Sequence, residues 1–374
     1  RSPQAGALPD AMAGLSLFAL PPETRVGPQR LTASVSQRFP GRGKRSLASS
    51  GMELEAEAAD HRMEAERLRL ATETRRHVYE LAFLAERAEI LAEEREHLVR
   101  HEELARARYA SGAGLQQEAV KIQAAITRRE QALLDLEILR RRHLASLNAL
   151  RDRPADTDAE GARLPSPEPL ALELMALRPV ALSRRPDLAA ARSMSAAAAR
   201  QVELAEKAAV PDWTVGLGYT LVDRRQDEAG RRLPPQGNGN DILALNASVS
   251  LPVWGKRRTA QLQEALERQS SAREQERLLT AQFEADLGEV AGRLPLLYQQ
   301  WHLFETVLEE QAQEALRSAE SAYTTGRLNA LDLLDAEHVL FEVRTGKARA
   351  AADWALAWAD LEGVLATAVP REED

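Results

Sequence analysis

The sequence contains no cysteine, few aromatic residues and no long hydrophobic run. The absence of cysteine from its 374 residues excludes disulfides, thiolate metal sites and a cysteine nucleophile within this segment. Aromatic residues make up only 4%, which argues against a core of large rings. No window of about 18 uncharged apolar residues occurs, which excludes a transmembrane helix. The nearest candidate, residues 351–369, carries Asp353, Asp360 and Glu362. Transmembrane β-strands escape this test because their residues alternate.

Charge and residue chemistry exclude further classes of protein. The net charge of -8 and the lack of a basic stripe predict that nucleic acid is not a partner. No Ser/His/Asp or paired-carboxylate arrangement stands out, so we single out no catalytic residue and no cofactor. An enzyme would need polar groups that converge in a pocket, and long helical hairpins provide little concavity, so we predict that the chain is not an enzyme. The abundance of Ala, Leu, Glu and Arg is typical of long helices.

The chain repeats itself. LTASVS at residues 31–36 returns as LNASVS at residues 245–250, an offset of 214 positions. The same offset superposes Gly41 on Gly255, and RYASG at 108–112 on AYTTG at 322–326. Matches at one offset over such a distance indicate an internal duplication. We therefore predict a first repeat at residues 1–150, a linker at 151–183 and a second repeat at 184–374.

Each repeat carries two alternating segments that predict strands. WTVGLGYTL, residues 213–221, places Trp213, Leu217 and Tyr219 on one face and small polar residues on the other. LALNASVSL, residues 243–251, alternates likewise, and weaker counterparts occur in the first repeat. We expect strands at about 11–20, 30–37, 212–222 and 241–251. Nine residues suffice for a tilted strand to cross a bilayer, which needs ~9 to 11. A half-buried strand of a soluble sheet is the alternative.

Long helices follow the strands. Apolar residues recur every third or fourth position between 256 and 322, which is a coiled-coil pattern. Pro295 is the one strong stop signal in this stretch, and there we expect a bend. We predict helices at about 45–107 and 256–322, each ending at a Tyr-x-x-Gly turn, and returning helices at about 115–150 and 328–366. An Ala-rich helix at about 184–210 opens the second repeat. Its first-repeat counterpart is largely missing, so we expect the N-terminus to be incomplete, with any signal peptide or lipid anchor lying upstream.

Four strands pose a physical problem for a membrane protein. They are too few to close a barrel around a pore, and open sheet edges are not tolerated in lipid. If these strands lie in a membrane, several copies of the chain must share one barrel.

The residues resemble the TolC family of outer-membrane efflux proteins. The resemblance covers nearly the whole chain and rests on RRPDLAAA, VPDWTVGLGY, ASVSLPVWGKRR and AYTTGRLNALDLLDAEHVLFE, in this order. VGPQRLTASVSQRFPGRGKR is closest to the branch that serves heavy-metal pumps.

The resemblance implies a mainly α fold with a small β part. A duplicated helix-strand-strand-long helix-helix unit would build long coiled-coil α-hairpins and contribute four strands to a trimeric 12-stranded transmembrane β-barrel. It implies an exit duct in the Gram-negative outer membrane, with the helices in the periplasm. The partners it implies are two further copies of the chain, a periplasmic adaptor protein, an inner-membrane transporter of the RND type and outer-membrane lipid. The duct would pass solutes, metal cations among them.

The resemblance also assigns roles to residues. It predicts a periplasmic gate from Asp332 and Asp335, with Tyr323 and, at the equivalent level of the first repeat, Glu118. Both aspartates could instead be solvated first-turn residues stabilised by the helix dipole. The arginine that the best-known member of the family uses at the gate falls on Leu328, next to Arg327, which is a departure from that member's pattern. Adaptor or transporter docking is predicted at the two turns, that is at Tyr109, Gly112, Tyr323 and Gly326.

Two further groups have competing interpretations. Trp213, Tyr219 and Trp254 fit a lipid-interface girdle, or ordinary packing. His97 and His101 have the i, i+4 spacing of a metal pair, but the surrounding glutamates favour a solvated charged face, so we predict no metal site. For the whole chain, the main alternative is a soluble coiled-coil scaffold protein, which explains the helices but not the uncharged strands.

Overall fold

The computed structural model describes residues 2–159, 161, 163–169 and 174–369. Within them the chain is mainly helical with one small antiparallel sheet, as the sequence predicts. Contacts divide the chain into two compact units, Arg1–Arg62 with Asp187–Leu279 and Met63–Pro186 with Thr280–Asp374. Each unit takes segments from both predicted repeats, so the repeat is a unit of sequence and not of packing.

The domain boundaries 1–150, 151–183 and 184–374 stay predictions. Several of their residues, namely residue 1, residues 160, 162 and 170–173 of the linker, and residues 370–374, lie outside the described part of the chain.

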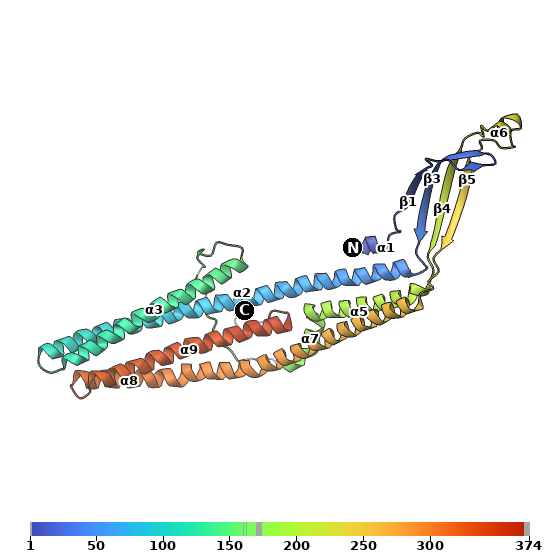
Figure 1. The fold of residues 1–374 in the computed structure, drawn as a ribbon. Coiled ribbons are helices and arrows are strands. Elements are labelled where there is room, and N and C mark those ends of the chain that lie inside the picture. Colours follow the sequence, from blue (N-terminus) through green and yellow to red (C-terminus); the bar gives the residue numbers. More distant parts are fainter. Residues whose placement is uncertain (1, 160, 162, 170–173, 370–374) are drawn as a thin grey trace. The chain divides into compact units, whose positions relative to one another are not determined.

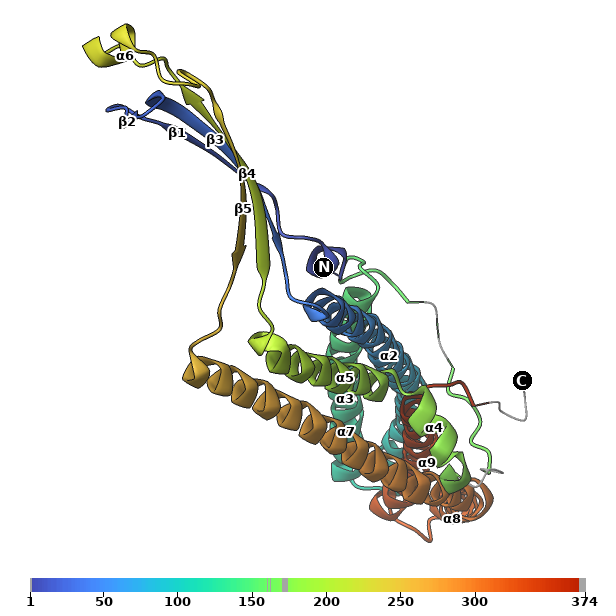
Figure 2. The ribbon, with the colours of Figure 1, turned by 90° about the vertical axis from the view of Figure 1, so that its right-hand side faces the viewer.

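The first unit contains the sheet. Its strands pair antiparallel in the order β1 (Met12–Leu17), β3 (Gly27–Phe39), β4 (Trp213–Val222) and β5 (Ile242–Val249), side by side in Figures 1 and 2. A further strand, β2 (Glu23–Thr24), pairs only with the start of β3. Within the described residues, β1 and β5 each have one neighbour in the main sheet, so both are edges.

The register gives the sheet one apolar face. Ala33 of β3 pairs with Leu15 of β1 and Tyr219 of β4, which in turn pairs with Leu243 of β5. Paired residues project from the same face, so apolar side chains from all four strands form a continuous surface. Most of it is exposed, with 66% of Leu15 and 70% of Leu243 accessible. The opposite face carries the small residues Gly14, Ser34, Gly218 and Ala244 at the adjacent register positions.

Helices complete the first unit. They are α1 (Ser2–Gly6), α5 (Pro186–Glu206) with the short 3-10 turn η2 (Lys207–Ala209), and α6 (Glu228–Arg232) in the loop between β4 and β5. The first parts of α2 (Lys44–Ala110) and α7 (Gly255–Leu303) also belong to it. Ion pairs one turn apart support these long helices, such as Arg268 with Glu264 at 2.6 Å.

The second unit is made of helical hairpins. The remainder of α2 returns as α3 (Gln116–Leu150), and α8 (Glu309–Thr324) returns as α9 (Ala330–Leu365), as Figure 1 shows. The 3-10 turn η1 (Leu174–Leu177) and α4 (Arg178–Arg184) lead to α5. The core includes Trp354 and Trp358 of α9, whose ring centroids are 5.0 Å apart and which pack with Phe283 and Leu287 of α7.

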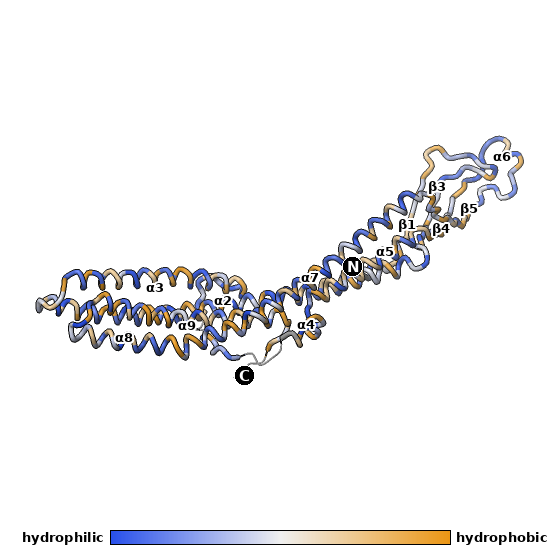
Figure 3. Tube along the Cα trace, turned by 90° about the horizontal axis from the view of Figure 1, so that it is seen from below, coloured by the Kyte–Doolittle hydropathy of each residue, from blue (hydrophilic) through white to orange (hydrophobic). Residues whose placement is uncertain are grey.

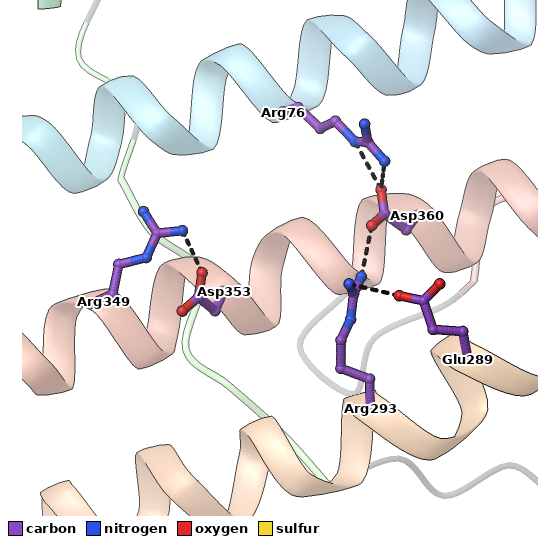
Figure 4. A network of polar contacts seen from close by, with 6 residues as sticks. All are labelled: Arg76, Glu289, Arg293, Arg349, Asp353 and Asp360. Carbon is purple, nitrogen blue, oxygen red and sulfur yellow. Dashed lines mark hydrogen bonds and ion pairs between the residues drawn. The ribbon is translucent and has the colours of Figure 1, made fainter. Parts of the chain in front are cut away.

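A polar network ties three helices of this unit together. Asp360 of α9 accepts hydrogen bonds from Arg76 of α2 at 2.6 Å and from Arg293 of α7 at 2.7 Å. Arg293 also bonds Glu289 on its own helix at 3.1 Å (Figure 4). The side chain of Asp360 is largely buried, so the two arginines compensate a charge that would otherwise be costly.

The predicted helix 256–322 is interrupted. α7 continues through Pro295 to Leu303, and a π-helical turn, η3 (Phe304–Leu308), separates it from α8. The Phe304 ring there packs against Gly346 of α9, where an added Cβ would lie only 2.7 Å from ring atoms. The π turn, which is a local widening of the helix, therefore begins at a residue that packs closely against α9.

The helices mix hydrophilic and hydrophobic residues along their lengths, as the alternating colours of Figure 3 show. In the described part of the chain, no helix combines the length and hydrophobicity that crossing a membrane would require.

Candidate functional site at the hairpin turns

The two hairpin turns have the same conformation. Gly112 has φ 75° and Gly326 has φ 74°, the left-handed region in which glycine costs least. In the first turn, the N–H groups of Gly112 and Ala113 bond the carbonyls of Tyr109 and Arg108; in the second, Gly326 and Arg327 bond Tyr323 and Ala322. This is the Schellman pattern of helix ends, repeated at the predicted 214-residue offset.

Arg108 joins the two turns. Its guanidinium donates to the main-chain carbonyl of Tyr323 at 2.7 Å and lies 4.5 Å from the centroid of the Tyr323 ring. Tyr323 is fully buried, whereas Tyr109 at the equivalent position is 51% exposed. The sequence prediction missed Arg108 because position 322, its counterpart, is an alanine and no local pattern marks the contact.

The predicted gate residues fall in two groups. Glu118, at the start of α3, lies close enough to Tyr323 to affect it: burial first and then this carboxylate raise the pKa of the tyrosine. Asp332 and Asp335 are exposed on the first turns of α9. Asn329 caps that helix by accepting from the N–H groups of Leu331 and Asp332, and its amide donates to the Asp332 carboxylate at 2.8 Å. The capping residue therefore holds Asp332 near the helix N-terminus.

The aromatic residues predicted for a lipid interface are all exposed. Trp213 begins β4 and Tyr219 lies within it, both on the apolar face, and Trp254 follows β5. The Tyr219 hydroxyl donates to Asp241, next to the start of β5.

A buried aspartate fixes the junction between strands and helices. Asp212, directly before β4, accepts hydrogen bonds from Lys44 at 2.8 Å, from the Gly41 N–H at 2.9 Å and from Arg38 at 2.5 Å. Burial alone would raise the pKa of this carboxyl, but the bonds from Lys44, Arg38 and Gly41 outweigh it and hold the pKa at about 2. The contact joins the end of β3 and the start of α2 to the α5–β4 junction.

The predicted solvated face around His97 and His101 is wrong. Glu94 and Glu102 are buried, and a carboxylate from another helix, Glu337 of α9, is 1% exposed beside the two imidazoles. Burial raises the pKa of Glu337 to about 8 and lowers that of His101 to about 4. The glutamates near these histidines in sequence suggested solvent, but helices distant in sequence cover this face of α2.

The chain resembles known outer-membrane channels. The profile of the family described as outer membrane efflux protein matches residues 177–367. VceC from Vibrio cholerae is 23% identical, with a TM-score of 0.79 over 98% of this chain and 89% of VceC. CmeC from Campylobacter jejuni is 14% identical, with a TM-score of 0.79 over 100% of this chain and 80% of CmeC.

The open state of the MtrE channel from Neisseria gonorrhoeae is 18% identical, with a TM-score of 0.75 over 100% of this chain and 83% of MtrE. At these identities the likeness concerns the fold. No curated protein sequence matches the chain.

Proposed function

This chain belongs to the outer membrane efflux protein family, and from that premise we propose that it forms the exit duct of a tripartite efflux system in a Gram-negative outer membrane. In this role the chain is a passive conduit for solutes and catalyses no reaction. The helical hairpins extend into the periplasm, where an adaptor protein and an inner-membrane transporter of the RND type engage them.

The exposed apolar face of the sheet carries this proposal. Side chains such as Leu15, Leu217 and Leu245 are each more than half exposed, although they form one continuous surface. A surface of this kind in a water-exposed sheet would favour aggregation. Contact with lipid removes it from water, and the opposite face of small polar residues suits a water-filled interior.

The sheet edges support a homotrimer. β1 and β5 each lack a neighbour on one side within the described residues, and unpaired backbone groups are costly in lipid. Pairing β5 of one copy with β1 of the next satisfies both edges, and three copies give a closed 12-stranded barrel. Trp213, Tyr219 and Trp254 then belong to its interface girdle.

The gate lies at the hairpin turns in this proposal. Threefold repetition brings copies of Asp332 and Asp335 around one axis, where their negative potential favours cations. Tyr323, held by Arg108 and close to Glu118, packs the tip behind them. The exposed turns at Tyr109 to Gly112 and at Tyr323 to Gly326 are the docking surfaces for the adaptor or transporter.

We further propose that the transported solutes include metal cations, because the sequence of residues 26–45 resembles the branch of the family that serves heavy-metal pumps. A strain that lacks the gene tests it: sensitivity to metal salts, and not to organic solutes, is the expected phenotype.

The first experiment measures the native mass of the membrane-extracted, upstream-extended chain in detergent. We expect three chains per particle and aggregation when detergent is removed. A water-soluble monomer or dimer would refute the duct and favour the coiled-coil scaffold.

The gate is tested in planar bilayers. The double variant D332N/D335N should reduce cation selectivity, seen as a shift of the reversal potential toward zero in a salt gradient. The control D135N/D286N removes the same charge from exposed positions on α3 and α7 and should leave selectivity unchanged. Equal shifts in both variants would show that the aspartates act only through net charge.

A further inference from the structure

Three helices of the second unit bring metal-binding side chains together close to the hairpin turns. His97 and His101 lie one turn apart on α2, Glu320 is four residues from the end of α8, and Glu337 comes from α9. One donor atom each from His97, His101 and Glu320 lies within 4.8 Å of the other two. Two histidines spaced i, i+4 on a helix present both imidazoles to one ion.

The polar atoms at this place do not satisfy one another. The carboxylate oxygens of Glu337 lie 3.7 Å from Nδ1 of His97 and 3.6 Å from Nε2 of His101, beyond hydrogen-bonding distance. Within the described residues, both Glu337 oxygens and Nε2 of His101 are buried without a hydrogen-bond partner. Glu337 is only 1% exposed, and a buried polar group without a hydrogen-bond partner costs folding free energy. This points to a ligand at the cluster.

The charges around the cluster are of both signs, and the positive charge of Arg100 acts on both imidazoles. Arg129 is engaged by Glu94 at 2.6 Å, and Arg344 by Glu93 at 2.8 Å, so two nearby arginines already have acidic partners. Glu320, in contrast, forms no ion pair within the part of the chain described here. Within the described residues, neither Glu320 nor Glu337 is therefore bonded to an arginine or lysine.

We propose that His97, His101 and Glu320 bind one divalent transition-metal ion of the Zn²⁺ class, and that the buried carboxyl group of Glu337, beside both imidazoles, positions them for the ion. Imidazole with carboxylate suits zinc and its neighbours rather than magnesium or calcium. Atoms that share a tetrahedral zinc ion at ~2.1 Å lie roughly 3.4 Å apart. Side-chain shifts of about 1 Å therefore complete the site, and Glu320 is only partly buried.

The bound ion joins α2 to α8, with α9 contributing Glu337. These helices belong to the two different hairpins, so the ion cross-links the first hairpin to the second close to their turns. Since the unfolded chain cannot present these groups together, binding stabilises the folded unit in proportion to the logarithm of metal concentration. The site is independent of the duct proposal, because its test needs no transport.

The test uses the full chain in detergent, stripped with a chelator, then titrated with Zn²⁺ in a calorimeter. We expect one ion per chain, no heat with Mg²⁺, and a higher apparent melting temperature with Zn²⁺. The double variant H97Q/H101Q should lose at least about 100-fold in affinity, and E337Q about 10- to 100-fold, the range for residues that support metal ligands.

The matched control is H61Q/H338Q, which removes two histidines outside the cluster; His338 is exposed next to Glu337. It should bind Zn²⁺ as the wild type does. If H97Q/H101Q fails to reach wild-type helicity by circular dichroism, E320Q decides, since it changes a single, partly buried residue and should still weaken binding at least about tenfold. The proposal is refuted if the wild type does not bind Zn²⁺, or if E320Q and H97Q/H101Q bind it with unchanged affinity.

Discussion

Replacing Asp212 by asparagine tests whether one buried carboxylate holds the junction between the sheet and the helices. The substitution keeps the shape of the side chain but removes the charge that Lys44 and Arg38 neutralise. Both bonds are charge-assisted, because each joins a charged side-chain donor to the carboxylate. Asparagine also replaces one acceptor oxygen by an NH2 group, which cannot accept a hydrogen bond from these donors.

The magnitude follows from the pKa of Asp212. Lowering it from the ordinary 3.8 to about 2 corresponds to about 2 kcal/mol of preference for the ionised carboxylate in the folded state. Breaking a fully buried pair costs ~3 to 5 kcal/mol, but the Arg38 side chain is 60% exposed and water replaces part of its lost interaction. We therefore expect D212N to lose about 2 kcal/mol of unfolding free energy at pH 7.

The loss should depend on pH in a defined direction. A carboxyl with a depressed pKa stabilises the folded state above its unfolded pKa, near 4, and this contribution disappears as pH falls through about 2. The difference between wild type and D212N should stay constant from pH 7 to pH 5. It should then shrink between about pH 4 and pH 2.

The assay is chemical unfolding in detergent, followed by far-ultraviolet circular dichroism, with D223N as the control. Asp223 follows β4 as Asp212 precedes it, and it also pairs with an arginine of β3, Arg30 at 2.6 Å. That pair is exposed, so D223N should cost less than about 1 kcal/mol. Equal losses in the two variants, or a D212N loss that persists unchanged at pH 2, would refute the reasoning.

Two further predictions concern the hairpins. G346A should lose about 1 to 3 kcal/mol of stability, because the added Cβ overlaps the Phe304 ring at 2.7 Å. G288A is the control, since no neighbouring atom lies within 4 Å of a Cβ added there, and it should gain up to about 1 kcal/mol in the same unfolding assay. A stabilised G346A would contradict the close contact. R108A removes the bond to the Tyr323 carbonyl and the ring contact, so it should cost about 2 kcal/mol and speed hydrogen exchange at the second turn; unchanged exchange would contradict the proposed link between the turns.

The local features of the fold could be predicted from the sequence because they depend on near neighbours. Alternation assigned Leu217 and Tyr219 to one face of β4, and the register gives the sheet that apolar face. The Tyr-x-x-Gly signal marked both hairpin turns, since only glycine takes a left-handed conformation at little cost. The duplication predicted that the turns would be alike, and their φ angles and hydrogen bonds are.

Contacts between distant segments could not be predicted in this way. The sequence showed Arg108 as one of many helix arginines, and the environment of His97 as solvated. Which face of a long helix is covered depends on the helices packed against it, and neither Tyr323 nor Glu337 can be matched to its neighbour by spacing.

Most of the helices, both turns and the two faces of the strands therefore follow from the local amino-acid pattern, because each depends on residues a few positions apart. The contact of Arg108 with Tyr323, the bonds of Asp212 at the strand–helix junction and the burial of Glu337 beside two imidazoles depend on the folded chain. Burial and pairing of this kind arise between segments that are brought together only by folding, and they determine which polar groups are deprived of water.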